Sequence, residues 1–149
     1  MTTEIEVVQR PTAFLVGLPV IGRFDELGTL VPAAWDALRD AVAGTGLSGP
    51  FAELSVELGQ GRYHETLGVL VEDTGGDLPQ VPGAVVGVVP AGRWVQVTHE
   101  GPREAIAATF GRLLEWLEES GHQAGEHKLD TGYRLDGAPE THVVAVQLG

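Results

Sequence analysis

Acidic side chains are the residues of this sequence best suited to do chemistry. Glu65, Asp130 and Glu140 fall in or beside segments that we expect to be strands. A carboxylate in an apolar cleft either stays charged by pairing with a cationic ligand or has its pKa raised enough to act as a general acid. His142 adds a base that would pair with a carboxylate across such a cleft. The alternative for each acid is a solvated strand face, which is common in a chain with 21 acidic residues.

Aromatic side chains supply the apolar walls that a ligand site needs. They bury a large area and attract a cation to the face of the ring. Trp94, expected on a strand, and Trp116, near a helix end, fit a cleft wall and core packing equally well. Trp35 and Phe110 occupy equivalent positions on two apolar helical stripes, so we expect them in the core. The remaining aromatic candidates for the site are Phe14, Tyr63 and Tyr133.

Other catalytic and cofactor patterns are missing from the sequence. The five histidines include no His-x-x-x-His pair, and there are no cysteines, so we expect no metal site, disulfide or thiolate catalysis. No G-x-S-x-G elbow, phosphate-binding loop or dinucleotide fingerprint occurs either. We therefore expect no cofactor and assign no catalytic residue.

The charge balance limits the partners of the chain. Nine basic and 21 acidic residues give a formal net charge of −12, which argues against binding to nucleic acid or to an anionic membrane surface. No apolar run approaches the roughly 20 residues of a membrane span, and residues 1–10 lack the features of a secretory signal. We expect a cytoplasmic protein whose ligand is neutral or cationic.

The elements that position these side chains repeat with a shift of 75 residues. A period of half the chain indicates a duplicated module rather than a solenoid. Two copies that each bury one face of a sheet leave a groove where they meet, and small-molecule sites favour such places. We expect a single domain over 1–149, with a first module to about residue 73, a linker of about 73–83 and a second module over 84–149. The matching positions include Val31 with Ile106, Trp35 with Phe110, Leu38 with Leu113, Val42 with Leu117, and Glu65 with Glu140.

Each module is predicted to contain strands around one helix. Alternation of apolar and polar residues predicts strands, and apolar residues spaced by three and four predict helices. We expect the first helix to begin at a Thr29 cap, with Pro32 in its first turn, to stop at Gly44, and to follow a connecting segment at 22–28. The predicted strands are 4–9, 13–20, 52–58, 65–71, 84–90, 93–99, 128–133 and 141–148, and the second helix is 101–120.

Three stretches of the sequence resemble one known family. Residues 90–102, PAGRWVQVTHEGP, are similar to the start of the second module of GyrI-like small-molecule-binding domains, which are also the effector-binding domains of bacterial transcription activators. Residues 114–122, LEWLEESGH, resemble the helix end of that family, and 67–71, LGVLV, resemble the matching last strand of its first module. The resemblance extends over nearly the whole chain.

The resemblance implies an α+β fold. Proteins of this family have two strand-helix-strand-strand modules related by pseudo-twofold symmetry, with antiparallel sheets that form a concave cleft backed by two helices. Aromatic walls and an acidic residue hold the ligand in that cleft. This sequence departs from the family at the acids, because Asp130 follows Leu129 rather than an aromatic residue and His142 stands where an acid is common.

The resemblance also implies a function. We expect a stand-alone protein that binds a hydrophobic, cationic or planar small molecule, a drug or natural product, as in multidrug binding and antibiotic resistance. Two alternatives stay open: a hydrolase that opens strained cyclopropane-bearing natural products for self-protection, and a module that binds a protein partner such as a separate regulator or gyrase. The ligand-binding residues predicted from the aromatic and acidic patterns and the resemblance are Phe14, Tyr63, Glu65, Trp94, Trp116, Asp130, Tyr133, Glu140 and His142.

Overall fold

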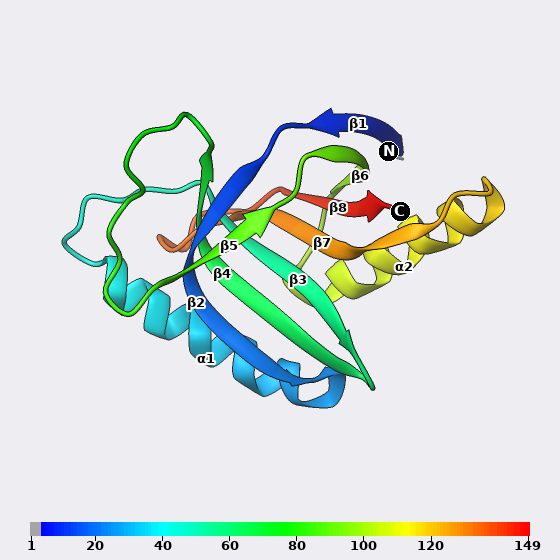
Figure 1. Cartoon of the computed structure of the whole chain (residues 1–149). Helices are drawn as coiled ribbons and strands as arrows, with labels where there is room; N and C mark the ends of the chain where they lie inside the picture. Colours follow the sequence, from blue (N-terminus) through cyan, green and yellow to red (C-terminus); the bar gives the residue numbers. More distant parts are fainter. Residues whose placement is uncertain (1–3) are drawn as a thin grey trace.

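The computed structural model describes residues 4–149 as two helices and eight strands (Figure 1). The helices are α1 (Phe24–Val42) and α2 (Ile106–Glu119), and a short 3₁₀ turn (Arg103–Ala105) precedes α2. The strands are β1 (Glu6–Arg10), β2 (Ala13–Arg23), β3 (Phe51–Gly59), β4 (Arg62–Glu72), β5 (Val85–Val89), β6 (Gly92–His99), β7 (Ala124–Tyr133) and β8 (His142–Leu148).

The strands form one antiparallel sheet whose order is symmetric. The order is β1-β6-β8-β7-β3-β4-β2-β5, and reading it backwards exchanges each strand of one half with its counterpart in the other. At the centre, Leu54 of β3 and Leu129 of β7, which the 75-residue shift superimposes, are Cα partners. The pseudo-twofold axis therefore passes between β3 and β7, and the α+β fold of two related modules is confirmed. Because β3 and β7 pair across the modules, the sheet is continuous rather than divided in two.

The first strand of each module pairs with the other module. β1 lies beside β6, and β5 lies beside β2. These two strands form the edges of the sheet. Residues 73–84 contain no helix or strand and carry the chain from β4 to β5. The two modules therefore interlock instead of packing as separate halves.

Helix α1 begins earlier than the sequence pattern indicates. The predictions of a Thr29 cap, of Pro32 in the first turn and of a connecting segment before them are wrong, because β2 continues through Arg23 and the helix follows at once. The carboxylate of Glu26 accepts a hydrogen bond of 2.9 Å from the backbone N–H of Arg23, which caps the first turn. Pro32 lies inside the helix and offers no N–H to the carbonyl of Gly28.

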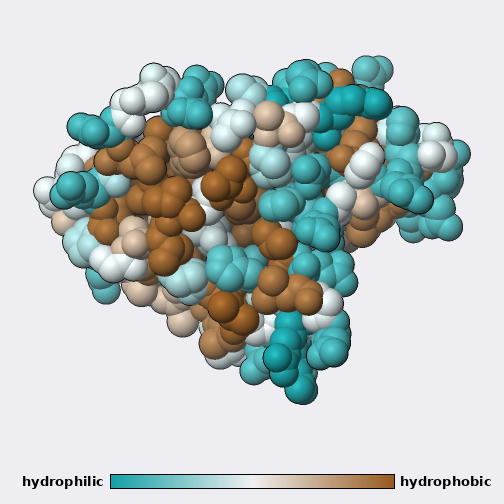
Figure 2. Space-filling model, in the orientation of Figure 1, coloured by the Kyte–Doolittle hydropathy of each residue, from teal (hydrophilic) through white to brown (hydrophobic). Residues whose placement is uncertain are grey.

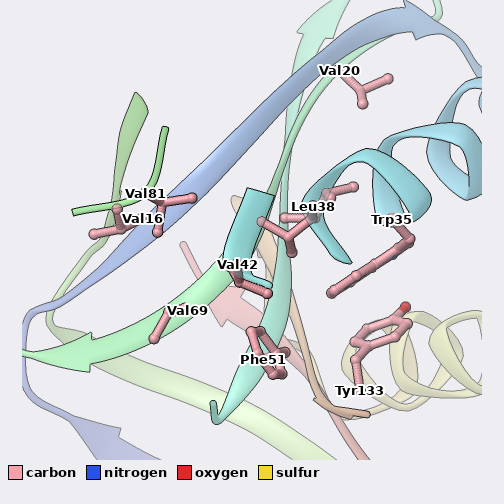
Figure 3. Packing of buried hydrophobic residues seen from close by; sticks show 10 residues of the cluster. Val16, Val20, Trp35, Leu38, Val42, Phe51, Val69, Val81 and Tyr133 are labelled. Carbon is pink, nitrogen blue, oxygen red and sulfur yellow. The ribbon is translucent and has the colours of Figure 1, made fainter. Parts of the chain in front are cut away.

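Both helices cover the same face of the sheet. Helix α1 packs through Trp35 and Leu38 against β2 and β4 (Figure 3). Helix α2 packs through Leu113 and Leu117 against β6 and β8. Trp35 also stacks on Tyr133 of β7, with ring centroids 4.3 Å apart. Trp35 is therefore a core residue, as predicted, and through Tyr133 it packs α1 against the second module.

The opposite face of the sheet buries side chains without a helix. Leu15, Leu54, Trp94 and Leu129 belong to one buried cluster there. Apolar surface gathers over β5 and the adjoining strands in Figure 2, and the exposed apolar residues of β5 are Val85, Val86 and Val88. In the part of the chain that the structure describes, no helix is both long and apolar enough to cross a membrane.

Candidate ligand-binding site

A cavity of about 590 Å³ lies between the two helices, above the centre of the sheet. Helices α1 and α2 form its sides, and residues of β3, β4 and β7 form its floor. Its volume lies within the usual range of small-molecule sites. It also lies across the pseudo-twofold axis, where the repeat predicts a groove.

The walls of the cavity are apolar and aromatic. None of the residues that α1 and α2 contribute to the lining carries a charge; they include Leu27, Val31, Ile106 and Leu114. Such walls remove a ligand from water and make any charge on the floor act at short range. The aromatic residues of the lining are Phe24, Tyr63, Phe110 and Tyr133.

The floor carries three carboxyl groups on neighbouring strands. Glu53 of β3, Glu65 of β4 and Asp130 of β7 all line the cavity. Glu53 and Asp130 are Cα partners, and Ser55 is the Cα partner of Glu65. Since side chains alternate along a strand, Glu53 and Ser55 face the cavity while Leu54 between them faces the opposite core. The central strands thus hold all three acids on the helix side of the sheet.

Glu65 is buried, and only one of its oxygens has a hydrogen-bond partner. The residue is 5% exposed. Its Oε1 accepts a hydrogen bond of 2.9 Å from the Ser55 hydroxyl, whereas no group of residues 4–149 donates to Oε2. Burial, followed by the charge of Glu53, raises the pKa of Glu65 to about 8. Glu65 is therefore mostly protonated at neutral pH.

The hydroxyl of Tyr133 lies between two carboxyl groups. Its oxygen is 3.0 Å from Oε2 of Glu53 and still closer to Oδ2 of Asp130. Burial raises the pKa of Tyr133, and the charges of Glu53 and Asp130 add to this effect. Burial also raises the pKa of Glu53, against the opposing effect of its hydrogen bond with Tyr133. The phenol therefore stays protonated and serves as a buried donor.

A chain of hydrogen bonds and ion pairs connects two cavity residues, Asp130 and Arg103, through His142 and Glu140, which do not line the cavity. Oδ1 of Asp130 lies 2.7 Å from Nδ1 of His142, and Nε2 of His142 lies 3.0 Å from Oε1 of Glu140. Glu140 pairs in turn with Arg103, whose guanidinium lies 4.9 Å from the centre of the Tyr133 ring. Burial lowers the pKa of His142, but the hydrogen bonds and charges of the two carboxylates outweigh burial and raise it overall. Burial likewise opposes the donors around Glu140, chiefly Arg103, which hold the pKa of Glu140 at about 2.

The cavity brings together four of the nine residues predicted for the site. These four are Tyr63, Glu65, Asp130 and Tyr133. His142 and Glu140 do not line the cavity, but they continue the hydrogen-bond chain that begins at Asp130. They lie behind Asp130 and hold its carboxyl group in place through His142.

Trp94 lies on the opposite face of the sheet from the cavity. It alternates with Val95 and Val97, which pack against α2, so its ring points into the other core. The ring is fully buried, and its Nε1 donates a hydrogen bond of 3.1 Å to the carbonyl of Pro90. Of the two interpretations of Trp94, the structure therefore supports core packing rather than a cavity wall.

Trp116 and Phe14 also lie away from the cavity. Trp116 stands near the end of α2 and stacks on His122, with ring centroids 5.9 Å apart. Phe14 lies on β2 six residues before Val20, the Cα partner of Glu65. Six residues of extended chain span about 20 Å, which separates Phe14 from the floor.

Several cavity residues are not indicated by the sequence patterns. Glu53 belongs to the polar face of a predicted strand, and only the pairing of β3 with β7 brings it beside Asp130. Lys128 and Arg103 also line the cavity. Phe110, predicted to be a core residue like Trp35, is half-buried: it packs against the core beneath α2 and also lines the cavity. Across residues 4–149, no group of three or more acidic or histidine side chains is placed to hold a metal ion.

Solved structures share this fold at low sequence identity. The chain is similar to an integron cassette protein from the mobile metagenome of Vibrio cholerae, with a TM-score of 0.72 and 10% identity over 99% of this chain and 98% of that one. It is similar to SAV2435 bound to tetraphenylphosphonium, with a TM-score of 0.74 and 9% identity over 98% and 94% of the chains. It is also similar to a hydrolase encoded by lin2189 from Listeria innocua, with a TM-score of 0.59 and 12% identity over 98% and 92%. A comparison with curated protein sequences finds no match.

Two interlocked modules with a cavity on their pseudo-twofold axis define a class of small-molecule-binding folds. Within that class, the sequence pattern of the GyrI-like small molecule binding domain matches residues 3–146. The chain belongs to the GyrI-like family, and the prediction from residues 67–71, 90–102 and 114–122 is confirmed.

Proposed function

We propose that the cavity binds a hydrophobic monocation, a drug or natural product whose positive charge is carried on an apolar or planar framework. The observation that carries this proposal is Glu65, a buried carboxyl group whose Oε2 has no hydrogen-bond partner among residues 4–149. A buried polar group without a partner is costly, and a cation in the cavity would supply that partner.

The walls support a ligand that is large and apolar. Uncharged side chains of both helices and the faces of Tyr63 and Phe110 surround the floor. Aromatic faces attract cations, most strongly where water is excluded. SAV2435, a protein of similar fold, is bound to tetraphenylphosphonium, a cation of this kind. That likeness supports the ligand class by analogy.

Sequestration of a toxic drug or natural product is the biological setting that this proposal favours. A binding domain of this kind in the cytoplasm would lower the free concentration of such a compound. A separate DNA-binding regulator or gyrase as a protein partner stays a prediction from the resemblance.

Matched lipophilic ions test the proposal. Tetraphenylphosphonium and tetraphenylborate have similar size and shape but opposite charge. In calorimetric titrations at about pH 9, we expect saturable binding of the cation and at least about tenfold weaker binding of the anion. Glu65→Gln removes the charge and keeps the shape, so we expect about tenfold weaker binding of the cation. Glu57→Gln, on the exposed end of β3, is the matched control and should leave binding unchanged. Equal binding of the two ions would contradict the proposal.

A second candidate function is hydrolysis of a strained ring. The observation that favours it is the Tyr133 hydroxyl, held between Glu53 and Asp130 beside the protonated Glu65. A fold relative from Listeria innocua is described as a hydrolase. In such a reaction, Glu65 or Tyr133 would protonate the ring substituent while a carbon–carbon bond of a cyclopropane breaks. The oxygen of water would bond to the ring carbon, and the proton that this water loses would return to the deprotonated acid.

Mass spectrometry separates hydrolysis from passive binding. A cyclopropane-bearing natural product incubated with the protein would gain the mass of one water. We expect Tyr133→Phe and Glu65→Gln to abolish this conversion and Glu57→Gln to retain it. Binding of the compound without any gain of mass would exclude the hydrolase and leave the binding function in place.

A further inference from the structure

The hydroxyl of Tyr133 is shared by two carboxyl groups of the cavity floor. Tyr133 has one hydroxyl hydrogen, but its oxygen lies within hydrogen-bond distance of both Glu53 and Asp130. Asp130 also faces His142, whose second ring nitrogen faces Glu140. An imidazolium donates to both carboxylates, so Asp130 has two hydrogen-bond partners, His142 and Tyr133. The Tyr133 hydroxyl is thus held by Glu53 and Asp130, and it gives Glu65 no hydrogen bond.

Glu65 shares this floor and forms no ion pair with a cation of residues 4–149. The guanidinium of Arg103 is held by Glu140. Lys128 lies over the Tyr63 ring, 6.0 Å from its centroid, and forms no ion pair with an acid of residues 4–149. The charged and titratable groups that face Glu65 are Glu53 on β3, Tyr63 on its own strand, Lys128, Asp130 and Tyr133 on β7, and Arg103 before α2. The lining residues of α1 and α2 are uncharged, so neither helix supplies a counter-charge.

We propose that the cavity exchanges a proton for its ligand: a cation that binds against Glu65 displaces the proton of its carboxyl group into solvent. This inference rests on the proposed function and adds its regulation. The exchange balances, because neutral Glu65 and a monocation give a carboxylate paired with the cation and one free proton. Only the O–H bond of Glu65 breaks, and buffer accepts the proton.

The exchange makes affinity for cations depend on pH. Since the pKa of Glu65 is raised to about 8, its proton must be expelled at neutral pH, whereas above about pH 8 the carboxylate is already formed. The affinity should therefore fall about tenfold for each pH unit below 8 and level off above it. A neutral aromatic ligand expels no proton, so its affinity should not follow this curve. The cavity would thus hold cations more tightly as pH rises and release them on acidification.

Calorimetry counts the exchanged proton directly. Tetraphenylphosphonium is titrated into the protein in phosphate and in Tris, whose enthalpies of ionisation differ, at several pH values. We expect about one proton released per bound cation near pH 6.5 and almost none near pH 9.5. Triphenylphosphine oxide, a neutral aromatic probe, should release none at either pH. Glu65→Gln should bind the cation weakly with no proton release, and Glu57→Gln should behave like the wild type.

Each outcome supports or overturns a separate statement. Binding of tetraphenylphosphonium without proton release at pH 6.5 would overturn the exchange and leave the proposed function intact. Proton release that persists in Glu65→Gln would overturn the assignment to Glu65. Failure of the wild type to bind the cation at any pH would overturn the proposed function itself. The wild-type proton count depends on no variant, so a poorly folded Glu65→Gln would not remove the test.

Discussion

Glu65 and Glu140 are the same residue type at positions that the 75-residue repeat superimposes, yet their environments act in opposite directions. The pKa of Glu65 is raised to about 8, and the pKa of Glu140 is held at about 2. Glu65 has one hydroxyl donor and a neighbouring acid. Glu140 accepts hydrogen bonds from Arg103, from the backbone N–H of Arg134 and from His142. The donors around each carboxyl group, rather than its residue type, decide whether it keeps its proton at neutral pH.

The difference in pKa between Glu65 and Glu140 indicates that the two modules contribute differently to the site. Glu65 lies within β4 and faces the cavity, whereas Glu140 precedes the start of β8 and lies outside it. The second module thus supplies hydrogen-bond donors to Asp130 and Glu140 from its own residues. The first module leaves Glu65 without an ion pair and its Oε2 without a hydrogen-bond donor among residues 4–149, and under the proposed function a cation would supply the missing partner.

Asp130→Asn should break the second-module network with the largest effect on stability. Asp130 and His142 are buried, with side chains 6% and 1% exposed. Removing one partner of a buried charge pair costs about 3–5 kcal/mol. Because the pKa of His142 is raised in the folded protein, its charged form stabilises the fold at low pH, and this contribution is lost as pH rises through that pKa. Urea unfolding should therefore give a larger loss at about pH 6 than at about pH 9.

The control for Asp130→Asn is an acid that also pairs with a cation but lies in solvent. Asp136 pairs with Arg134 on the surface, so Asp136→Asn should change unfolding little. A loss of under about 1 kcal/mol in Asp130→Asn would mean that the buried pair is no more important than a surface pair.

Glu65→Gln should have the opposite effect on the stability of the protein: it should stabilise the fold at high pH. A carboxyl group with a raised pKa favours the folded state below its unfolded pKa of 4.5, and this advantage is lost as pH rises to about 8. Gln does not ionise, so the variant should be more stable than the wild type at about pH 9, by on the order of 3 kcal/mol. Near pH 5 the two proteins should unfold alike.

Urea unfolding at the two pH values measures this change, with Glu57→Gln as the exposed control on β3. A Glu65→Gln variant that is destabilised at about pH 9 would show that ionised Glu65 is compensated in the folded protein. The contrast between the two modules would then be lost.

The periodicity of apolar residues predicts most of the helices and strands, because these elements depend on local sequence patterns. The stripes at Leu38 and Leu113 place both helices, and the repeat predicts that the modules are related by a pseudo-twofold axis. The start of α1 is missed because Glu26 caps the helix through a carboxylate, where the pattern favours Thr29. The pairing of β1 with β6 and of β5 with β2 is set by contacts distant in sequence, which no local pattern contains.

The site is predicted less completely than the fold. Tyr63, Glu65, Asp130 and Tyr133 are identified by residue type, and all four line the cavity. Trp94 misleads because its residue type fits a cavity wall, while the alternation with Val95 and Val97 directs it to the other face. Glu53 is missed because its proximity to Asp130 depends on the register of β3 with β7.

Glu140→Gln should destabilise the protein by a smaller amount than Asp130→Asn. It removes the charge that pairs with Arg103, and it leaves His142 with one carboxylate. Arg103 is 40% exposed, so water screens this pair, and we expect a loss of about 1–2 kcal/mol at neutral pH. The pKa of Glu140 is lowered to about 2, so its contribution is present above 4.5 and is lost as pH falls towards 2. Urea unfolding should therefore show the difference between variant and wild type shrinking as pH falls from 4.5 towards 2, and a constant difference would contradict a lowered pKa of Glu140.

Lys128→Met should have the smallest effect, and it should strengthen binding. Lys128 lines the cavity and places its charge near Tyr63, so it competes with a cationic ligand for the same aromatic face and acidic floor. Its charge also lowers the pKa of Glu65 slightly, so the comparison belongs at about pH 9, where Glu65 is ionised in both proteins. We expect about threefold tighter binding of tetraphenylphosphonium, because a half-buried charge is partly screened by water. Lys128→Arg keeps the charge and should bind as the wild type does. Weaker binding in Lys128→Met would mean that Lys128 contacts the ligand through its methylene chain. The view that Lys128 only competes with the ligand for the acidic floor would then be wrong.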